Sequence, residues 1–348
     1  MTVLIRKINI DYLRITACLM VIFLHLSAQY WHTTNVMTFE WSIYNFYDCL
    51  VRSAVPLFFM ISGTLFLNKN SMPSLNVLFK KNILKMFIVY IFWSFLYALD
   101  SAGIKGGIDL DKIIYFMVNA KYHLWYLPVL IGMYFILPLF WIIAKFENGK
   151  YLKYICTMFF LFAVIKPTLG QITFLDYPVN EFLDNFNFAL VGYTGYYLYG
   201  YVLERYKDHF NKIPTWSLVV LFAFIVFVAA EFNLFYARFI RETTSLFYNN
   251  SIFVFLEALI LFMIYLRLPH ISVLEKHSAL ILKISKNTLF VYLLHVFVME
   301  KLNMYFGINV LIGSPIISIP LLSLLIFIIC QIIAEILNKI PFVNKWLM

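Results

Sequence analysis

Long apolar runs, separated by short polar segments, follow one another along almost the whole chain. Each run is roughly 20 residues long, the length that a helix needs to cross the ~30 Å hydrocarbon core of a bilayer. The runs are continuous, whereas strands of a membrane β-barrel alternate apolar and polar residues over about 10 positions. The pattern therefore predicts about ten transmembrane helices, at residues 10–31, 44–67, 83–99, 124–144, 152–167, 184–203, 215–232, 250–267, 285–304 and 314–337.

The composition agrees with this pattern. Of the 348 residues, 63% are hydrophobic and only 13% are charged, and the mean hydropathy is +0.83. A soluble domain does not need so much apolar surface. We therefore expect an all-α, polytopic membrane helix bundle that forms one domain over residues 1–348.

The net charge of +9 raises the question of nucleic acid binding. The basic residues, however, lie mainly in the short segments between apolar runs, and most of them fall on one side if the N-terminus is cytoplasmic. Most of the remaining basic residues, with Arg52 among them, are assigned to segments on the opposite, outer side of the membrane. This is the positive-inside pattern, so the charge predicts a lipid bilayer as partner, no nucleic acid, and two cytoplasmic termini.

Three ionisable residues lie in the first apolar run: Asp11, Arg14 and His25. Arg14 and His25 are eleven positions apart, which places them on one helix face and roughly 16 Å apart along the axis. Ionisable groups inside a membrane are energetically unfavourable and usually face a protein interior or a watery cavity. A neutral imidazole suits the removal of a proton from a hydroxyl group, while packing against a neighbouring helix is the structural alternative for His25.

Arg14 lies near the cytoplasmic third of its span, where a permanent cation is suited to holding a phosphate or to reaching the interface. Asp11 is three positions earlier and can pair with it. Lys81 and Lys85, four apart after the second span, are either ordinary positive-inside charges or a second contact for an anionic donor. Ser62 and Gly63 are small enough to let helices approach closely.

The fourth span opens with His123, Trp125 and Tyr126, a composition typical of an aromatic belt at the outer surface but also of a site beside a sugar. His295 lies in the middle of the ninth span, one turn after Tyr292. Glu257 is a further acid inside a span. The spacing of the four cysteines matches no zinc site, and no nucleotide-binding or hydrolase motif is present, so we expect neither a metal nor a bound cofactor.

Four segments resemble, in the expected order, the acyltransferase-3 family of integral membrane acyltransferases: IDYLRITACLMVIFLH, VPLFFMISG, HLWYL and SKNTLFVYLLH. The likeness extends over nearly the whole chain and is strongest to short members such as surface-polysaccharide O-acetyltransferases. It implies an enzyme of a bacterial plasma membrane that takes an acyl group, usually acetyl from cytoplasmic acetyl-CoA, and passes it to a hydroxyl of a surface glycan or its lipid-linked precursor.

The resemblance implies that His25 is catalytic, with Arg14 as its partner. The family's basic motif of two arginines three apart corresponds here to Asn82 and Lys85, so one cation is lost and Lys81 is the neighbouring substitute. Donor binding is thus expected at Arg14, Lys85 and Lys81. Supporting roles are expected for Asp11, Ser62, His123, Trp125, Tyr126 and His295.

Two other functions compete with this interpretation. A transporter would use His25, Glu257 and His295 as a proton relay, although we find no repeated halves with broken spans. A non-catalytic partner in glycan assembly would not need His25. The sequence leaves the oligomeric state open, and it permits both direct transfer and transfer through an acyl-enzyme.

Overall fold

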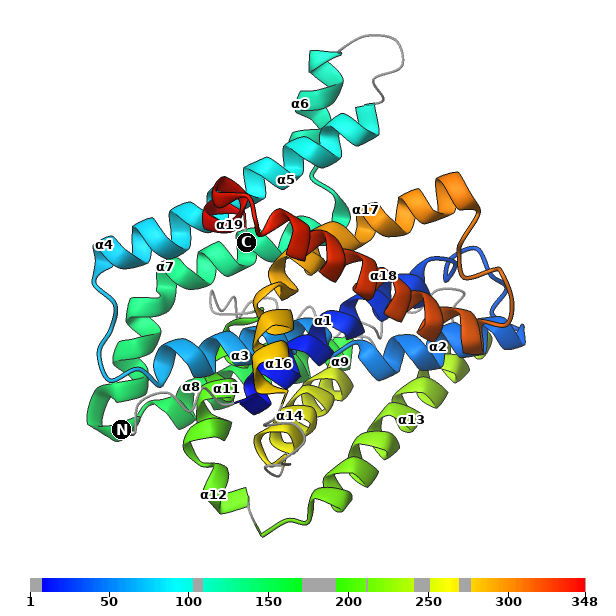
Figure 1. Ribbon diagram of the computed structural model, residues 1–348. Coiled ribbons are helices and arrows are strands. Elements are labelled where there is room, and N and C mark those ends of the chain that lie inside the picture. Colours follow the sequence, from blue (N-terminus) through cyan, green and yellow to red (C-terminus); the bar gives the residue numbers. More distant parts are fainter. Residues whose placement is uncertain are drawn as a thin grey trace. The chain divides into compact units, whose positions relative to one another are not determined.

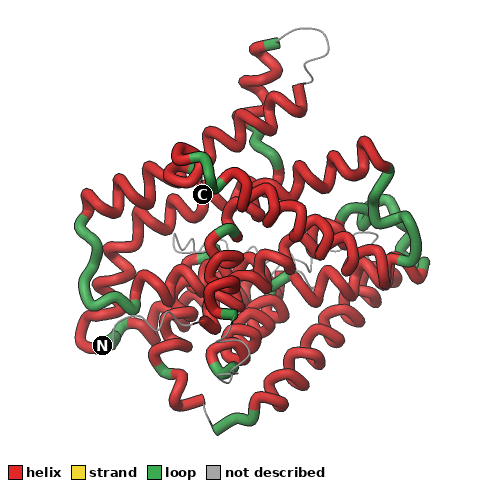
Figure 2. Tube along the Cα trace, in the orientation of Figure 1, coloured by secondary structure: helices red, strands yellow, loops and turns green. Residues whose placement is uncertain are grey.

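The computed structural model describes residues 8–102, 109–170, 192–210, 212–240, 251–268 and 277–347. Within these ranges the regular secondary structure is entirely helical (Figures 1 and 2). The predicted all-α membrane bundle is therefore confirmed.

Among the described residues, eight helical stretches have the length and hydropathy of a membrane span: Ile8–Ala28, Phe39–Leu67, Leu75–Ala102, Tyr122–Asn148, Leu152–Leu169, Thr215–Phe239, Thr288–Phe306 and Pro315–Leu337. The predicted span 250–267 corresponds to the shorter apolar helix α14 (Ile252–Leu266). The predicted span 184–203 lies partly outside the described residues, and its described part forms α11 (Thr194–Arg205). The count of ten and the cytoplasmic termini stay predictions.

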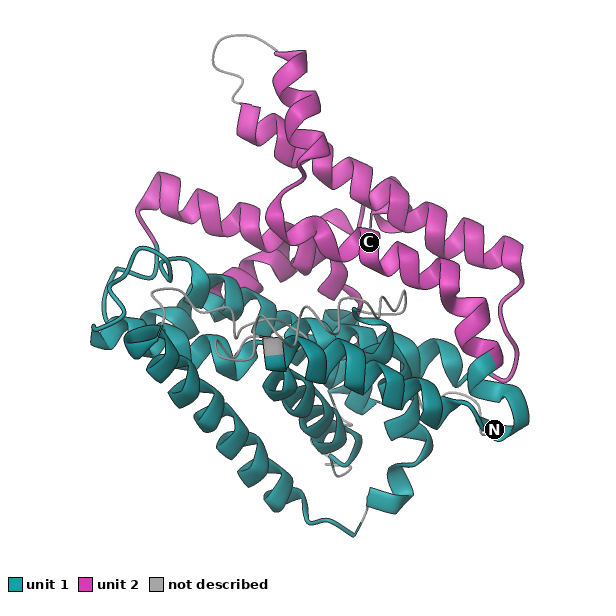
Figure 3. Cartoon of the chain, turned by 180° about the vertical axis from the view of Figure 1, so that it is seen from behind, with its two compact units in different colours: residues 1–69, 143–285, 309–324 teal, residues 70–142, 286–308, 325–348 magenta. Residues whose placement is uncertain are grey.

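The chain divides into two compact units (Figure 3). Unit 1 comprises residues 1–69, 143–285 and 309–324. Besides α11 and α14, its main helices are α1 (Ile8–Ala28), α2 (Phe39–Val51), α3 (Ala54–Leu67), α8 (Leu152–Phe159), α13 (Thr215–Phe239) and nearly all of α16 (Ser278–Lys286).

In unit 1, α1 packs against α2, α3 and α14. Two polar contacts join α1 to the C-terminal end of α14. Asn9 Nδ2 donates to the Leu268 carbonyl at 3.2 Å, and the hydroxyl oxygens of Thr16 and Tyr265 lie 2.6 Å apart. Hydrogen bonds between apolar helices help to fix their relative position. The N-terminal half of α1, which contains Asn9 and Thr16, is therefore held against the end of α14.

The predicted second span is two helices instead of one. The apolar stretch Phe39–Leu67 is interrupted at Arg52 and Ser53, which form the turn between α2 and α3. Arg52 therefore lies inside this stretch, and its assignment to an outer segment was wrong. The lone cation is retained there because the carboxylate of Asp48, one turn earlier, binds its guanidinium group.

Helices α3 and α11 are in backbone contact through two glycines. A Cβ atom added at Gly63 would lie 1.7 Å from the carbonyl oxygen of Tyr197, and one added at Gly200 would lie 2.1 Å from that of Met60. Small residues allow such close approach, and packing of this kind is a main source of helix association in membranes. Gly63 thus has the packing role that its size predicts.

Unit 2 comprises residues 70–142, 286–308 and 325–348. Its helices include α4 (Leu75–Leu78), α5 (Leu84–Ala102), α6 (Leu110–Val118), most of α7 (Tyr126–Lys145), α17 (Thr288–Phe306), the second half of α18 (Pro315–Leu337) and α19 (Pro341–Trp346). A π-helical turn, Phe79–Ile83, leads into α5. Such turns are rare and are frequent at functional sites.

A buried amide joins the start of α17 to α18. The side-chain nitrogen of Asn287 donates to Gln331 Oε1 at 3.1 Å and to Glu335 Oε1 at 2.7 Å. Its oxygen accepts from Asn338 Nδ2 at 2.9 Å. Asn287 is 3% exposed, so this network satisfies an amide that would otherwise be costly to bury.

Candidate active site

The buried carboxylate of Asp11 on α1 contacts residues of two helices, α1 itself and α16, which are far apart in the sequence. Ser285 Oγ, on α16, donates to Asp11 Oδ1 at 2.6 Å. Arg14 NH1 lies 3.9 Å from the same oxygen. Asp11 is only 4% exposed, so neighbours of this kind replace the water that its charge would otherwise require. The predicted pairing of Asp11 with Arg14 is present, and Ser285 joins it.

Arg14 and His25 lie on one uninterrupted helix. Because α1 is helical from Ile8 to Ala28, the two side chains project from the same face, roughly 16 Å apart along the axis. Both are partly exposed, and the Arg14 side chain keeps 21% of its accessible surface. The face of α1 therefore offers a cation and an imidazole to a ligand that extends along the helix.

The two predicted donor-binding lysines flank the end of the π-helical turn of unit 2. Lys81 lies in the turn and is exposed, and Lys85 lies in the first turn of α5 and is partly buried. Their spacing keeps both on about the same side of the chain within one turn. An ammonium group on a flexible stem suits a phosphate as a point charge.

Two buried histidines meet in unit 2. The rings of His123 and His295 have centroids 5.3 Å apart, and both residues are 0% exposed. His295 Nδ1 lies 2.6 Å from the Tyr292 carbonyl, and His123 Nε2 lies 3.3 Å from the Leu293 carbonyl. A carbonyl only accepts, so these nitrogens carry protons, and in the neutral rings the lone pairs are on His295 Nε2 and His123 Nδ1.

Tyr97 connects this histidine pair to α5. Its hydroxyl donates to the Leu293 carbonyl at 2.8 Å and accepts from the Phe297 amide at 3.1 Å. The rings of Tyr97 and His123 are 5.0 Å apart. The hydroxyl of Tyr292 in turn donates to the His123 carbonyl. The cluster is thus a hydrogen-bonded interior site, in which polar groups fix the orientation of both imidazoles.

The aromatic-belt alternative is wrong for two of its three residues. His123 is buried, and Tyr126 is 6% exposed with its ring 5.3 Å from that of Tyr292. Trp125, whose side chain is 37% exposed, is the one of the three that fits an aromatic belt.

In unit 1, Ser62 Oγ donates to the Phe58 carbonyl of its own helix at 2.9 Å.

A family model described as an acyltransferase domain, acyltransferase-3, matches residues 7–335, which is nearly the full chain. The chain belongs to the acyltransferase-3 family. No curated protein and no solved structure matches it. The protein is therefore a membrane acyltransferase in general terms.

The predicted site residues of this acyltransferase fall into two groups. Unit 1 contains Asp11, Arg14, His25 and Ser62, and unit 2 contains Lys81, Lys85, His123, Trp125, Tyr126 and His295. The structure brings Asp11 and Arg14 together in the first group and His123, Tyr126 and His295 into one cluster, through Tyr292, in the second.

Sequence reasoning missed several polar residues that the acyltransferase buries. Ser285 lies within the late family-like segment but was passed over, because its partner Asp11 is 274 positions away. Arg52 and Asp48 were readable as an i, i+4 pair of opposite charge inside an apolar stretch. Tyr97 carries no local signal, because an isolated tyrosine in a membrane helix is ordinary.

Proposed function

We propose that the protein transfers an acyl group, acetyl in the first instance, from cytoplasmic acyl-CoA to a hydroxyl group of a cell-surface glycan or of its lipid-linked precursor. The site of action is a bacterial plasma membrane. The observation that carries the proposal is the face of α1, on which Arg14, held by Asp11, and His25 are aligned. Family membership supports the reaction class.

In this proposal Arg14 binds a phosphate group of CoA, and Asp11 keeps the guanidinium directed toward it. Ionised donors form hydrogen bonds to phosphate about twice as strong as neutral ones. Lys85 and Lys81 supply further positive charge to the same donor. The two basic elements lie in different units, so the proposal rests on their charge and on the family pattern.

His25 acts as the base. Its neutral imidazole takes the proton of the acceptor hydroxyl as the oxygen attacks the thioester carbonyl. The bond between acyl carbon and acceptor oxygen forms, the bond between acyl carbon and sulfur breaks, and the proton passes to the departing thiolate. In the alternative, His25 carries the acyl group itself and is released by the acceptor in a second step.

The test uses purified protein in liposomes with acetyl-CoA radiolabelled in the acetyl group, and an extract of host membranes as acceptor. Wild type is compared with His25→Ala, Arg14→Ala and the control His32→Ala, which changes an exposed histidine. We expect His25→Ala to reduce transfer by about 10²–10⁴-fold, the usual contribution of a general base. Arg14→Ala should raise the KM for acetyl-CoA, and His32→Ala should match wild type.

Transfer by His25→Ala at the wild-type rate would refute the assignment of His25 as the base. Label retained on wild-type protein without acceptor, and absent from His25→Ala, would select the acyl-enzyme route. Label that passes to the extract without staying on the protein would select direct transfer. Wild type that consumes no acyl-CoA of any chain length would overturn the proposal.

A further inference from the structure

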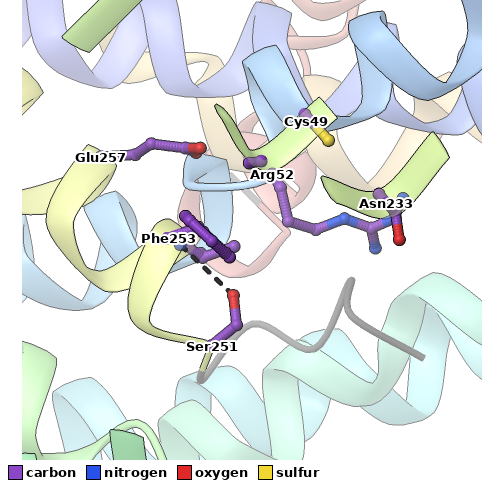
Figure 4. Close-up of a pocket in the computed structure, with 8 residues that line it drawn as sticks. Cys49, Arg52, Asn233, Ser251, Phe253 and Glu257 are labelled. Atoms are coloured by element: carbon purple, nitrogen blue, oxygen red, sulfur yellow. Dashed lines mark hydrogen bonds between the residues drawn. The ribbon is translucent and has the colours of Figure 1, made fainter. Parts of the chain in front are cut away.

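A small polar pocket in unit 1 lies outside the site described so far (Figure 4). Arg52 and Cys49 border it from the end of α2, Asn233 borders it from α13, and Ser251 and Glu257 border it from α14. These helices pack on one another within the unit. The pocket is therefore built by segments that are far apart in the sequence.

Two acceptor atoms in its wall are buried without a donor. Glu257 and Asn233 are each 1% exposed. Among the described residues, Glu257 Oε2 and Asn233 Oδ1 have no hydrogen-bond partner. Figure 4 shows the Glu257 side chain extending across the pocket toward Arg52. Buried acceptors are nearly always satisfied in folded proteins, so this pocket calls for a ligand that donates hydrogen bonds.

The charges in the wall restrict what that ligand is. Arg52 is held by Asp48, whose Oδ2 accepts from Arg52 Nε at 2.9 Å, and Asp48 is fully buried. The guanidinium group in the wall disfavours a metal cation, and the Glu257 carboxyl disfavours an anion. A neutral group avoids both conflicts if it donates hydrogen bonds to Glu257 and Asn233 and accepts one from the guanidinium group of Arg52. A hydroxyl group has this chemistry.

The size of the pocket agrees with a single hydroxyl. The space in it has room for about one water molecule, so the end of a polyol fits and a sugar ring does not. Helices α2 and α14, which border the pocket, also pack against α1, the helix of His25. The ring of Tyr47, which precedes Asp48, meets the ring of Phe23 on α1 edge-on at 4.9 Å between centroids.

We propose that this pocket binds a non-reacting hydroxyl group of the sugar acceptor, and that Glu257 and Asn233 thereby determine which acceptor is used. The inference rests on the proposed function, because it takes the acceptor to be a polyhydroxyl compound. A site built to bond a hydroxyl group discriminates strongly against an analogue that lacks it, since the buried polar groups are then left unpaired.

The test follows CoA release by the full-length protein in nanodiscs while the concentration of a host membrane extract is varied, and then while acetyl-CoA is varied. The variants are Glu257→Gln, which keeps size and shape, and Asn233→Ala. Glu231→Gln, an exposed change on the same helix as Asn233, is the matched control. Release without extract reports an intact donor site.

We expect Glu257→Gln to need at least about tenfold more extract for half-maximal rate, and Asn233→Ala about two- to tenfold more, as for hydrogen bonds to charged and neutral groups. The KM for acetyl-CoA and the extract-free rate should stay as in wild type. Unchanged extract dependence in both variants would show a structural water and overturn the inference while leaving the proposed function intact.

Two other results would also overturn it. A loss of acetyl-CoA affinity or of extract-free release in Glu257→Gln would assign the pocket a structural role. A rate in wild type that differs between sodium and choline chloride at equal ionic strength, with no such difference in Glu257→Gln, would identify a cation as the occupant. Failure of the proposed function itself is distinct, because wild type would then show no extract-dependent release.

Discussion

The close contact between α3 and α11 predicts a severe effect for one added methyl group. In Gly63→Ala the new Cβ would lie 1.7 Å from the Tyr197 carbonyl oxygen and 2.6 Å from its carbonyl carbon. A Cβ atom essentially never lies closer than 3.0 Å to such a neighbouring atom, so the helices must separate by at least about 1.3 Å. The opposing atoms are backbone, and no side-chain rotation can relieve the overlap.

Overpacking of this kind destabilises by about 1–3 kcal/mol and occasionally more. The separation also removes dispersion contacts along the interface, which is a main force between membrane helices. At roughly 2–4 °C per kcal/mol, we expect the melting temperature in detergent to fall by about 5 °C or more. Fluorescence-detected size exclusion after heating measures this on small amounts of protein.

Gly132→Ala is the matched control, because a Cβ at Gly132 in α7 meets nothing within 4 Å. Alanine is favoured over glycine in a helix by about 0.5–1 kcal/mol, so this variant should melt at or slightly above the wild-type temperature. If Gly63→Ala proved as stable as Gly132→Ala, the close approach of the two helices would be refuted.

Three further predictions concern buried hydrogen bonds. Ser285→Ala should raise the KM for acetyl-CoA several-fold with a smaller change in kcat, because Asp11 loses a donor and holds Arg14 less firmly; steady-state kinetics test this. Tyr97→Phe should lower stability by about 1–2 kcal/mol, because one hydroxyl serves two backbone groups. Asn287→Ala should lower it by about 1–3 kcal/mol, because the hydrogen bonds of a buried amide to three partly buried side chains are lost. Thermal unfolding in detergent measures both losses.

Conservative controls separate these effects from general damage. Ser285→Thr keeps the hydroxyl and should recover most of the acetyl-CoA affinity; an unchanged KM in Ser285→Ala would contradict the positioning role. Tyr90→Phe changes a partly exposed tyrosine of α5 and should leave stability as it is. Stability equal to wild type in Tyr97→Phe or Asn287→Ala would show that these bonds contribute little.

The positions of the spans were predictable because hydropathy and length depend on local composition. The break at Arg52 was missed, because continuous hydropathy on both sides conceals a two-residue turn. The belt-like interpretation of His123 and Tyr126 failed for a related reason, since composition does not tell which face a side chain presents. The π-helical turn Phe79–Ile83 has no comparable local signal.

The candidate site was predictable where its residues lie on one helix. The spacing of Asp11, Arg14 and His25 translates directly into geometry once the segment is helical. Ser285 required knowledge of tertiary packing, as did the encounter of Asn233 with Glu257 in one pocket. Such partners come from distant parts of the chain, and pattern within a window does not reveal them.

The bond between Ser285 and Asp11 also sets an order of events during biogenesis. Asp11 enters the bilayer with the first helix, but Ser285, which donates a hydrogen bond to it, is 274 residues further along the chain. At about 5–20 residues per second, Ser285 is made roughly 14–55 s later. During this interval Arg14, three residues away on the same helix, is the charge partner that α1 itself offers to Asp11, so the acid reaches its final environment only when translation is nearly complete.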